Sequence, residues 1–135
     1  MSKTYVLDAN ALLDLLTGNR AAGRITQLFR EIHQSKNSAL ISVLNWGEVF
    51  YHSWQRHGEQ AAHATMSNLS RLPIEIVPVN LAQALKAGEL KALHKIPYVD
   101  SIAAALASQH QATLVTSDHD FEKLGRQFPV LWLDR

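Results

Sequence analysis

The chain has 135 residues, of which 47% are hydrophobic and 19% charged, with a formal net charge of +1 and no cysteine. This composition excludes a disordered chain, a strong polycation, a disulfide framework and a zinc site built on thiolates. No apolar run approaches the ~20 residues of a membrane span, and the N-terminus lacks the pattern of a secretory signal. We therefore expect one cytoplasmic domain, residues 1–135, with no membrane attachment.

Short apolar runs and helical patterns alternate along the chain. In order they predict a strand at 5–7, helices at 11–16 and 20–34, a strand at 39–43, helices at 45–57 and 60–70, a strand at 74–77, helices at 81–93 and 98–110, a strand at 112–116, a short helix at 121–126 and a strand at 128–133. The first two helices are separated near Gly18 and Asn19. This alternation favours an α/β fold with a central parallel sheet of about five strands, flanked by helices.

Acidic residues follow two of the predicted strands and begin two of the predicted helices. Asp8 comes directly after the first strand, and Asp118 follows the fourth strand after one serine, with Asp120 two residues further on. Glu48 and Asp100 lie near the starts of the helices at 45–57 and 98–110. Ligands of parallel α/β sheets bind beyond the carboxyl ends of the strands, where these carboxylates can converge.

Each acid also has a purely structural explanation. Glu48 with Asn45 matches a capping box, and Asp100 can complement the positive end of its helix dipole. The three remaining acids can cap the helices that follow them. Taken singly, capping is the favoured interpretation. Taken together, crowded carboxylates raise one another's pKa unless a cation lies among them, which predicts a divalent metal site, and oxygen ligands suit Mg²⁺ or Mn²⁺.

Four segments carry a resemblance that spans essentially the whole chain. They are 6–12 (VLDANAL), 42–49 (SVLNWGEV), 98–104 (YVDSIAA) and 114–121 (LVTSDHDF). In this order and spacing they resemble the PIN domain family, and within it the compact VapC-type toxins of bacterial and archaeal toxin–antitoxin pairs. Ala9 departs from the family pattern, which usually has threonine or serine before the asparagine.

The resemblance implies an acidic quartet that binds Mg²⁺ or Mn²⁺, made of Asp8, Glu48, Asp100 and Asp118. Asp120 is then either a fifth acid or an outer partner of the quartet. Asn10 would orient Asp8, and Thr116 would orient Asp118 or a bound water. Ordinary hydrogen bonding in turns explains Asn10 and Thr116 equally well.

The activity that the resemblance implies is metal-dependent endoribonuclease activity, in which the protein is the toxin of a type II toxin–antitoxin pair. RNA hydrolysis would leave 5′-phosphate and 3′-hydroxyl ends, with Glu48 as a metal ligand or as the base that positions water. A small antitoxin protein and a homodimer are the implied partners. Two alternatives stay open: a PIN-domain nuclease of RNA processing or DNA repair without an antitoxin, and a catalytically silent module that binds RNA or protein.

Basic residues and histidines offer further candidate features. The candidate phosphate contacts are Arg20, Arg24, Lys86, Lys91, Lys95 and Arg126. A nuclease built on paired histidines is disfavoured, because His52, His57 and His63 share no helical face. The helix at 45–57 carries an aromatic stripe of Trp46, Phe50 and Trp54, opposite Glu48, Tyr51, His52 and Gln55. That stripe is either core or a surface that binds a partner.

Overall fold

The computed structural model describes residues 2–135 and contains a five-stranded sheet in the order β3-β2-β1-β4-β5, in which all neighbouring strands are parallel. The strands are β1 (Thr4–Leu7), β2 (Ser38–Ser42), β3 (Glu75–Val77), β4 (Thr113–Thr116) and β5 (Val130–Trp132). The predicted α/β fold with about five parallel strands is therefore confirmed.

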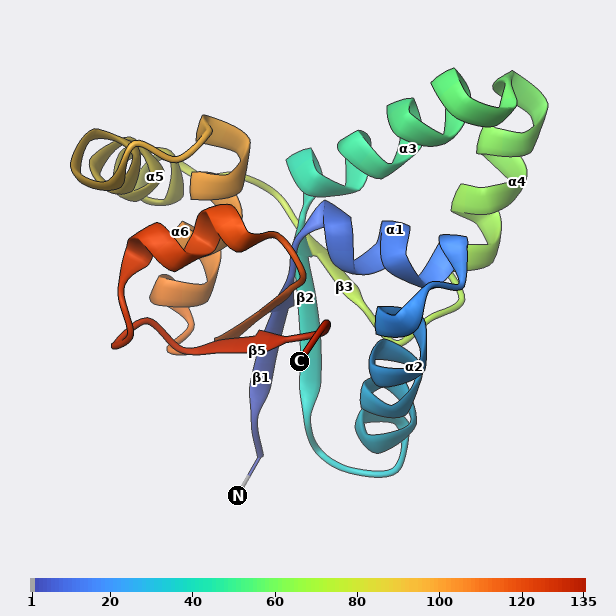
Figure 1. Ribbon diagram of the computed structural model, residues 1–135, viewed down its shortest axis with the longest axis horizontal. Helices are drawn as coiled ribbons and strands as arrows, with labels where there is room; N and C mark the ends of the chain where they lie inside the picture. The colour runs from blue at the N-terminus through green and yellow to red at the C-terminus, as the bar shows by residue number, and fades with distance from the viewer. Residues whose placement is uncertain (1) are drawn as a thin grey trace.

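Helices cover both faces of the sheet (Figure 1). On one side lie α1 (Ala9–Thr17), α2 (Arg20–His33), α3 (Val43–His57) and α4 (Glu59–Leu69); on the other lie α5 (Leu81–His94), α6 (Tyr98–Gln109) and the 3₁₀ helix η1 (His119–Leu124). Among residues 2–135, none of these helices combines the length and the apolarity needed to traverse a bilayer.

The alternation of side chains along the central strands builds two cores. Leu7 and Ile41 face the core that they share with α1 and α2, whereas Val6, Leu40 and Leu114 face the core that they share with α5 and α6. Burial on both faces explains why these strands are continuous apolar runs rather than alternating ones. Each fully buried leucine or valine stabilises the fold by roughly 1.5–3 kcal/mol.

The predicted break between the first two helices is confirmed at Gly18 and Asn19. Gly18 ends α1 with φ 67°, a left-handed conformation that favours glycine. Asn19 then caps α2, because its side chain accepts a hydrogen bond from the backbone N–H of Ala21 at 2.9 Å. The chain therefore reverses between two helices that pack against each other.

Two predicted boundaries near the expected site are wrong. The third helix begins at Val43 rather than at Asn45, because the side chain of Ser42 caps it by accepting from Leu44 N. The capping box between Asn45 and Glu48 therefore does not form, since Asn45 lies inside the helix. The short helix expected at 121–126 is the 3₁₀ helix η1, which starts earlier because Asp118 caps it.

Helix α3 buries a different stripe from the aromatic one. Val49 and Ser53 are buried on its inner face, while Phe50 and Trp54 pack edge to face with ring centroids 5.6 Å apart. Both rings also contact His63 of α4, so the aromatic stripe mainly joins α3 to α4. On the opposite side of α3, Glu48 is half-buried, and Tyr51, His52 and Gln55 are exposed.

Candidate metal centre

Asp8 lies at the carboxyl end of β1 and caps α1. Its Oδ1 accepts from Ala11 N at 2.9 Å, and its Oδ2 accepts from Thr116 Oγ1 at 2.5 Å. The residue is only 3% exposed, and this burial raises the pKa of its carboxyl to about 8. The two hydrogen bonds lower the pKa, but burial has the larger effect. The negative charges of Asp100 and Asp118 raise the pKa further. A cation placed beside Asp8 would restore its ionised form.

Thr116, at the end of β4, joins two of the acids. Its hydroxyl donates to Asp8 Oδ2 and accepts from the backbone N–H of Asp118, at 2.9 Å for the second bond. Because Thr116 is fully buried, these two bonds fix the loop after β4 relative to the end of β1. The hydroxyl of Thr116 thus contacts the side chain of Asp8 and the backbone of Asp118, and its orienting role stays a prediction.

Three carboxylates converge at the carboxyl edge of the sheet. One oxygen each of Asp100, Asp118 and Asp120 lies within 4.8 Å of the others. Asp100 stands in the first turn of α6, while Asp118 caps η1 by accepting from Asp120 N at 3.0 Å. Burial raises the pKa of Asp100 to about 7, and the charges of Asp118, Glu48 and Asp120 contribute further. Of the four acids expected at this edge, Asp100 and Asp118 belong to this group of three, and Asp8 and Glu48 do not.

Glu48 joins this group through Asn45. The side-chain nitrogen of Asn45 donates to Glu48 Oε1 at 3.1 Å and to the carbonyl of Val99 at 3.3 Å, next to Asp100. Asn45 is fully buried, and its Oδ1 has no hydrogen-bond partner among the described residues. Asn45 therefore holds Glu48 of α3 close to the start of α6, where Asp100 lies. The sequence instead favoured a helix-capping interaction for the pair of Asn45 and Glu48. Its spacing of three residues from Glu48 on one helix was the available clue.

Asn10 and Asp120 differ from the buried acids. Asn10 lies in the first turn of α1, half-buried, and its side chain makes no hydrogen bond within residues 2–135. Its expected role in orienting Asp8 gains no support from the geometry. Asp120 is exposed, and its Oδ1 lies 3.9 Å from the ammonium of Lys123.

A second link, which is partly buried, was not foreseen. The hydroxyl of Ser117 donates to Asp14 Oδ2 across the gap between α1 and the loop after β4. Asp14 Oδ1 also accepts from the side chain of Asn19, at 2.9 Å. Asp14 thereby braces the loop that carries Asp118. No sequence pattern connects residues 103 positions apart, so only the fold could reveal this contact.

The chemistry of this donor set fits a hard divalent cation. All four expected acids and Asp120 offer carboxylate oxygens, which are the ligands that Mg²⁺ and Mn²⁺ prefer. Within residues 2–135, Lys123 is the one basic side chain that forms an ion pair with any of them. Burial is the main cause of the raised pKa values of Asp8 and Asp100, and the charges of neighbouring acids add to it.

The PIN domain family matches residues 5–127 of this chain. The chain belongs to the PIN domain family. Among curated protein sequences, none matches significantly. A family of nucleases and a cluster of acids able to bind a metal ion together support a nuclease.

Solved structures give the same fold. A toxin–antitoxin complex from Klebsiella pneumoniae is 25% identical, with a TM-score of 0.68 over 96% of this chain and 97% of that one. VapBC-1 from nontypeable Haemophilus influenzae is 18% identical, with a TM-score of 0.75 over 98% and 99%. VapC20 from Mycobacterium tuberculosis, described as a toxin that cleaves the sarcin–ricin loop, is 18% identical, with a TM-score of 0.72 over 90% and 95%.

Proposed function

We propose that this protein is a metal-dependent endoribonuclease and the toxin of a type II toxin–antitoxin pair. The observation that carries the proposal is the convergence of the Asp100, Asp118 and Asp120 oxygens within 4.8 Å in a PIN domain. Buried Asp8 and half-buried Glu48 belong to the same group of charges: Asp100 and Asp118 raise the pKa of Asp8, and Glu48 raises that of Asp100.

A divalent ion, Mg²⁺ or Mn²⁺, would polarise a phosphate oxygen and lower the pKa of water. Asp8, Asp100 and Asp118 are the residues that we assign to holding it. Glu48 is a further ligand or orients the attacking water, and Asn45 holds its carboxylate in place. Water adds to phosphorus, the bond to the 3′ oxygen breaks, and that oxygen takes up a proton. The products carry a 5′-phosphate and a 3′-hydroxyl.

RNA with unpaired bases is the substrate that we propose. Its bases are accessible for stacking and hydrogen bonding, unlike those in a regular duplex. The similarity to VapC20, whose description names cleavage of the sarcin–ricin loop, supports this choice. The acidic centre itself repels a phosphodiester, so we expect the protein to be inactive without metal.

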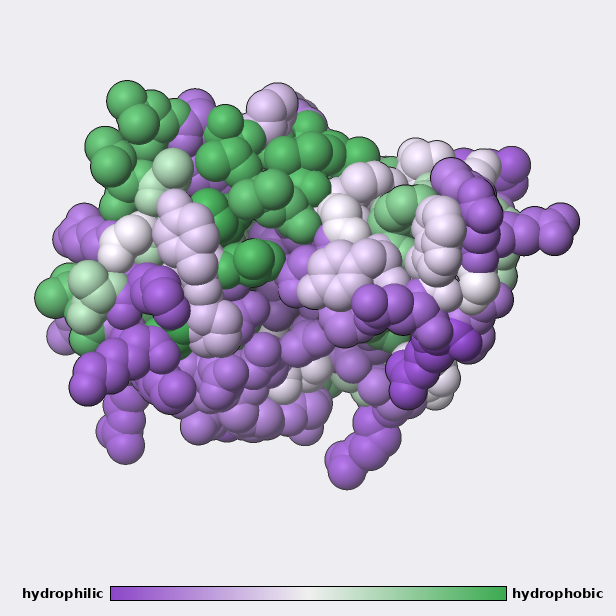
Figure 2. All heavy atoms as spheres, turned by 90° about the horizontal axis from the view of Figure 1, so that it is seen from above, coloured by the Kyte–Doolittle hydropathy of each residue, from purple (hydrophilic) through white to green (hydrophobic). Residues whose placement is uncertain are grey.

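A small antitoxin protein and a second copy of this chain are the partners that we propose. Several structures with this fold are toxin–antitoxin complexes. Figure 2 shows apolar side chains gathered over one side of the face at the carboxyl ends of the strands, from α5 to the start of α3. Exposed residues of these elements include Val43, Leu44, Leu81 and Leu85. An apolar surface of this kind supports a homodimer. Leu85→Lys places a charge on this surface, so it should shift the mass measured by light scattering from dimer to monomer.

The decisive experiment incubates the purified protein with a mixed RNA pool, with Mg²⁺ or with a chelator, and maps the new ends. We expect cleavage with 5′-phosphate and 3′-hydroxyl ends only when metal is present. The Asp100→Asn variant, purified in parallel, controls for contaminating nucleases. Cleavage that persists in chelator, or that this variant retains in full, would refute the proposal, and RNA binding without cleavage would favour a silent binding module.

A further inference from the structure

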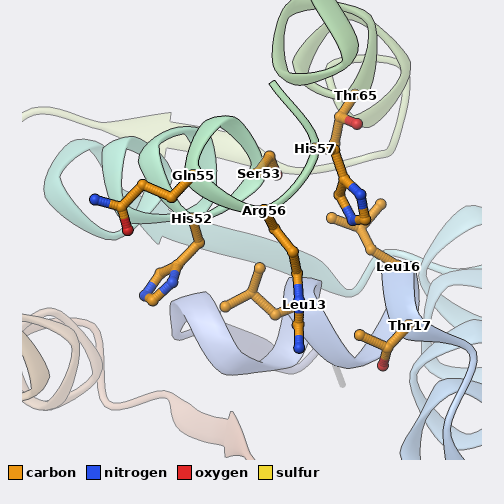
Figure 3. A pocket seen from close by; sticks show the side chains of 9 residues that line it. All are labelled: Leu13, Leu16, Thr17, His52, Ser53, Gln55, Arg56, His57 and Thr65. Carbon is orange, nitrogen blue, oxygen red and sulfur yellow. The ribbon is translucent and has the colours of Figure 1, made fainter. Parts of the chain in front are cut away.

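A groove of about 900 Å³ runs between α1, α3 and α4. His52, Gln55 and Arg56 of α3 stand on one side, and Leu13 and Leu16 of α1 stand on the other. In Figure 3, the side chains of His52 and Arg56 point from α3 towards α1, with Leu13 between the two helices. The groove therefore has polar groups on one wall and an apolar floor.

The α3 residues that line the groove come later on that helix than Glu48 of the acidic centre. Glu48, His52 and Arg56 recur every four residues of α3, so they lie on one side of the helix, each about one turn, or ~5.4 Å, from the next. The opposite helix, α1, begins at Asp8, which caps it within the same centre. Successive phosphates of an extended single strand are spaced by a similar distance, so a strand bound at the centre can follow α3.

The polar groups of the groove suit a polyanion. Within the described chain, its lining includes no acidic residue, in contrast to the neighbouring centre. Arg56 always carries positive charge, while His52 and Gln55 offer N–H donors to phosphate oxygens. Several basic residues that the sequence suggested for this task are engaged elsewhere: Arg24 and Lys91 donate to backbone carbonyls, and Lys86 pairs with Glu89.

An aromatic platform stands beside these donors. The ring of Tyr51 stacks on the imidazole of His52, with centroids 4.7 Å apart and 28° between the planes. Tyr51 is nonetheless 47% exposed, so its ring is open to a further stacking partner. Proteins that hold single-stranded nucleic acid combine a basic groove with aromatic rings on which bases stack.

We infer that the groove between α1 and α3 binds the single-stranded RNA next to the scissile phosphate, with Arg56 on a phosphate and the Tyr51–His52 pair under a base. The inference rests on the proposed function and adds where the substrate lies. An unpaired strand is required, because the bases of a duplex are not free to stack on a side chain.

The test measures the binding of a fluorescently labelled single-stranded RNA to protein in the Asp100→Asn background, so that no cleavage occurs. Arg56→Ala should weaken binding by about tenfold and lower the slope of log affinity against log salt by about one. Tyr51→Ala should weaken binding by about five- to tenfold, while Tyr51→Phe keeps the ring and restores it. Lys36→Ala, an exposed cation before β2 at the opposite edge of the sheet, is the matched control and should change neither value.

Cleavage by the otherwise unaltered protein separates this inference from the proposed function. Arg56→Ala and Tyr51→Ala should raise KM with little change in kcat. If the parent protein cleaves RNA with metal but both variants keep their KM and RNA affinity, the groove does not hold the substrate. A groove that serves a protein partner would give that result and would overturn the inference. Absence of cleavage by the parent protein would instead count against the proposed function.

Discussion

The protein has an inner group of carboxylates, the acids of the metal centre, and an outer group, Glu122 and Asp134 near the C-terminus. Their surroundings shift the pKa values of the two groups in opposite directions. In the metal centre, burial and neighbouring acids raise the pKa of Asp8 to about 8 and that of Asp100 to about 7. At the C-terminal end, hydrogen bonds from His119 lower the pKa of both Glu122 and Asp134. The residue types are the same, so the cause lies in what surrounds them.

The outer group supplies its own positive charge. His119 lies between Glu122 and Asp134, at 3.1 and 2.5 Å, and its ring stacks on Trp132 with centroids 5.2 Å apart. Arg135 pairs with Glu122 and places its guanidinium over the same indole, 4.6 Å from the ring centroid. Among residues 2–135, Lys123 is the one basic partner of the acids in the metal centre. In the outer cluster, positive side chains balance the carboxylates. In the inner cluster, the negative charge is balanced only when a cation binds.

The largest expected effect comes from removing an inner carboxylate. Asp8→Asn should lower the rate of metal-dependent RNA cleavage by more than the ~10–100-fold that losing an outer partner of a metal site costs. Its folded state should survive, because the asparagine oxygen can still accept from Ala11 N. A cleavage assay and circular dichroism test both points. Full activity in Asp8→Asn would remove Asp8 from the centre.

Asn45 should show the next largest effect, and it separates positioning from stability. Asn45→Leu keeps the volume but removes the donor that holds Glu48 against α6, so kcat should fall by about tenfold with KM little changed. Stability should fall by about 1–3 kcal/mol, because the carbonyl of Val99 loses a donor, although the substitution also removes the unpartnered Oδ1 of Asn45. Titration with Mn²⁺, followed by calorimetry, should show weaker binding.

The control for Asn45 lies on the same helix. Ser53 is equally buried, but its hydroxyl donates only to the carbonyl of Val49, one turn back. Ser53→Ala should therefore leave kcat and the affinity for Mn²⁺ unchanged. An Asn45→Leu variant with the same kinetics as Ser53→Ala would show that the hydrogen bond to Glu48 has no catalytic consequence.

The pH dependence of stability should have opposite signs for the two groups. Asp8 has a pKa of about 8 in the folded state, above its ordinary value of 3.8, so the folded protein retains a proton that the unfolded chain has lost. Without metal, the inner group should therefore make the fold less stable as pH rises from about 5 to 8, by a few kcal/mol. Glu122 and Asp134, with lowered pKa values, contribute stability above their ordinary pKa that is lost in acid.

Urea unfolding in chelator, from pH 5 to 8.5, measures this dependence. The decline should shrink in Asp8→Asn, which cannot ionise, and should also shrink when Mn²⁺ is added. Metal binds the ionised carboxylates and so replaces protons, and its contribution to stability grows with pH. A metal-free protein that is more stable at pH 8 than at pH 5.5 would contradict the assigned burial of Asp8.

The sequence predicted the fold and the acids better than it predicted their connections. The succession of strands and helices along the chain follows from apolar periodicity, and Asp8 and Asp118 follow strands whose carboxyl ends share an edge in a parallel sheet. The predicted start of α3 was wrong, because Ser42 and Asn45 are both good capping residues and only packing decides between them. The links from Thr116 to Asp8 and from Ser117 to Asp14 join distant segments, so no local pattern encodes them.

The smallest effect is expected in the outer group, and its smallness is informative. Glu122→Gln removes a charge that pairs with both His119 and Arg135, but Asp134 still pairs with His119, and the His119 ring and the Arg135 guanidinium still stack on the indole of Trp132. Exposed pairs are screened by solvent and salt, so the midpoint of urea unfolding should move less than for any variant above. RNA cleavage should be unchanged, although Glu122 is only two residues from Asp120. A loss of cleavage comparable with that of Asp8→Asn would mean that the two groups form one site, and that positive charge from the C-terminal end, rather than a divalent cation alone, balances the inner acids.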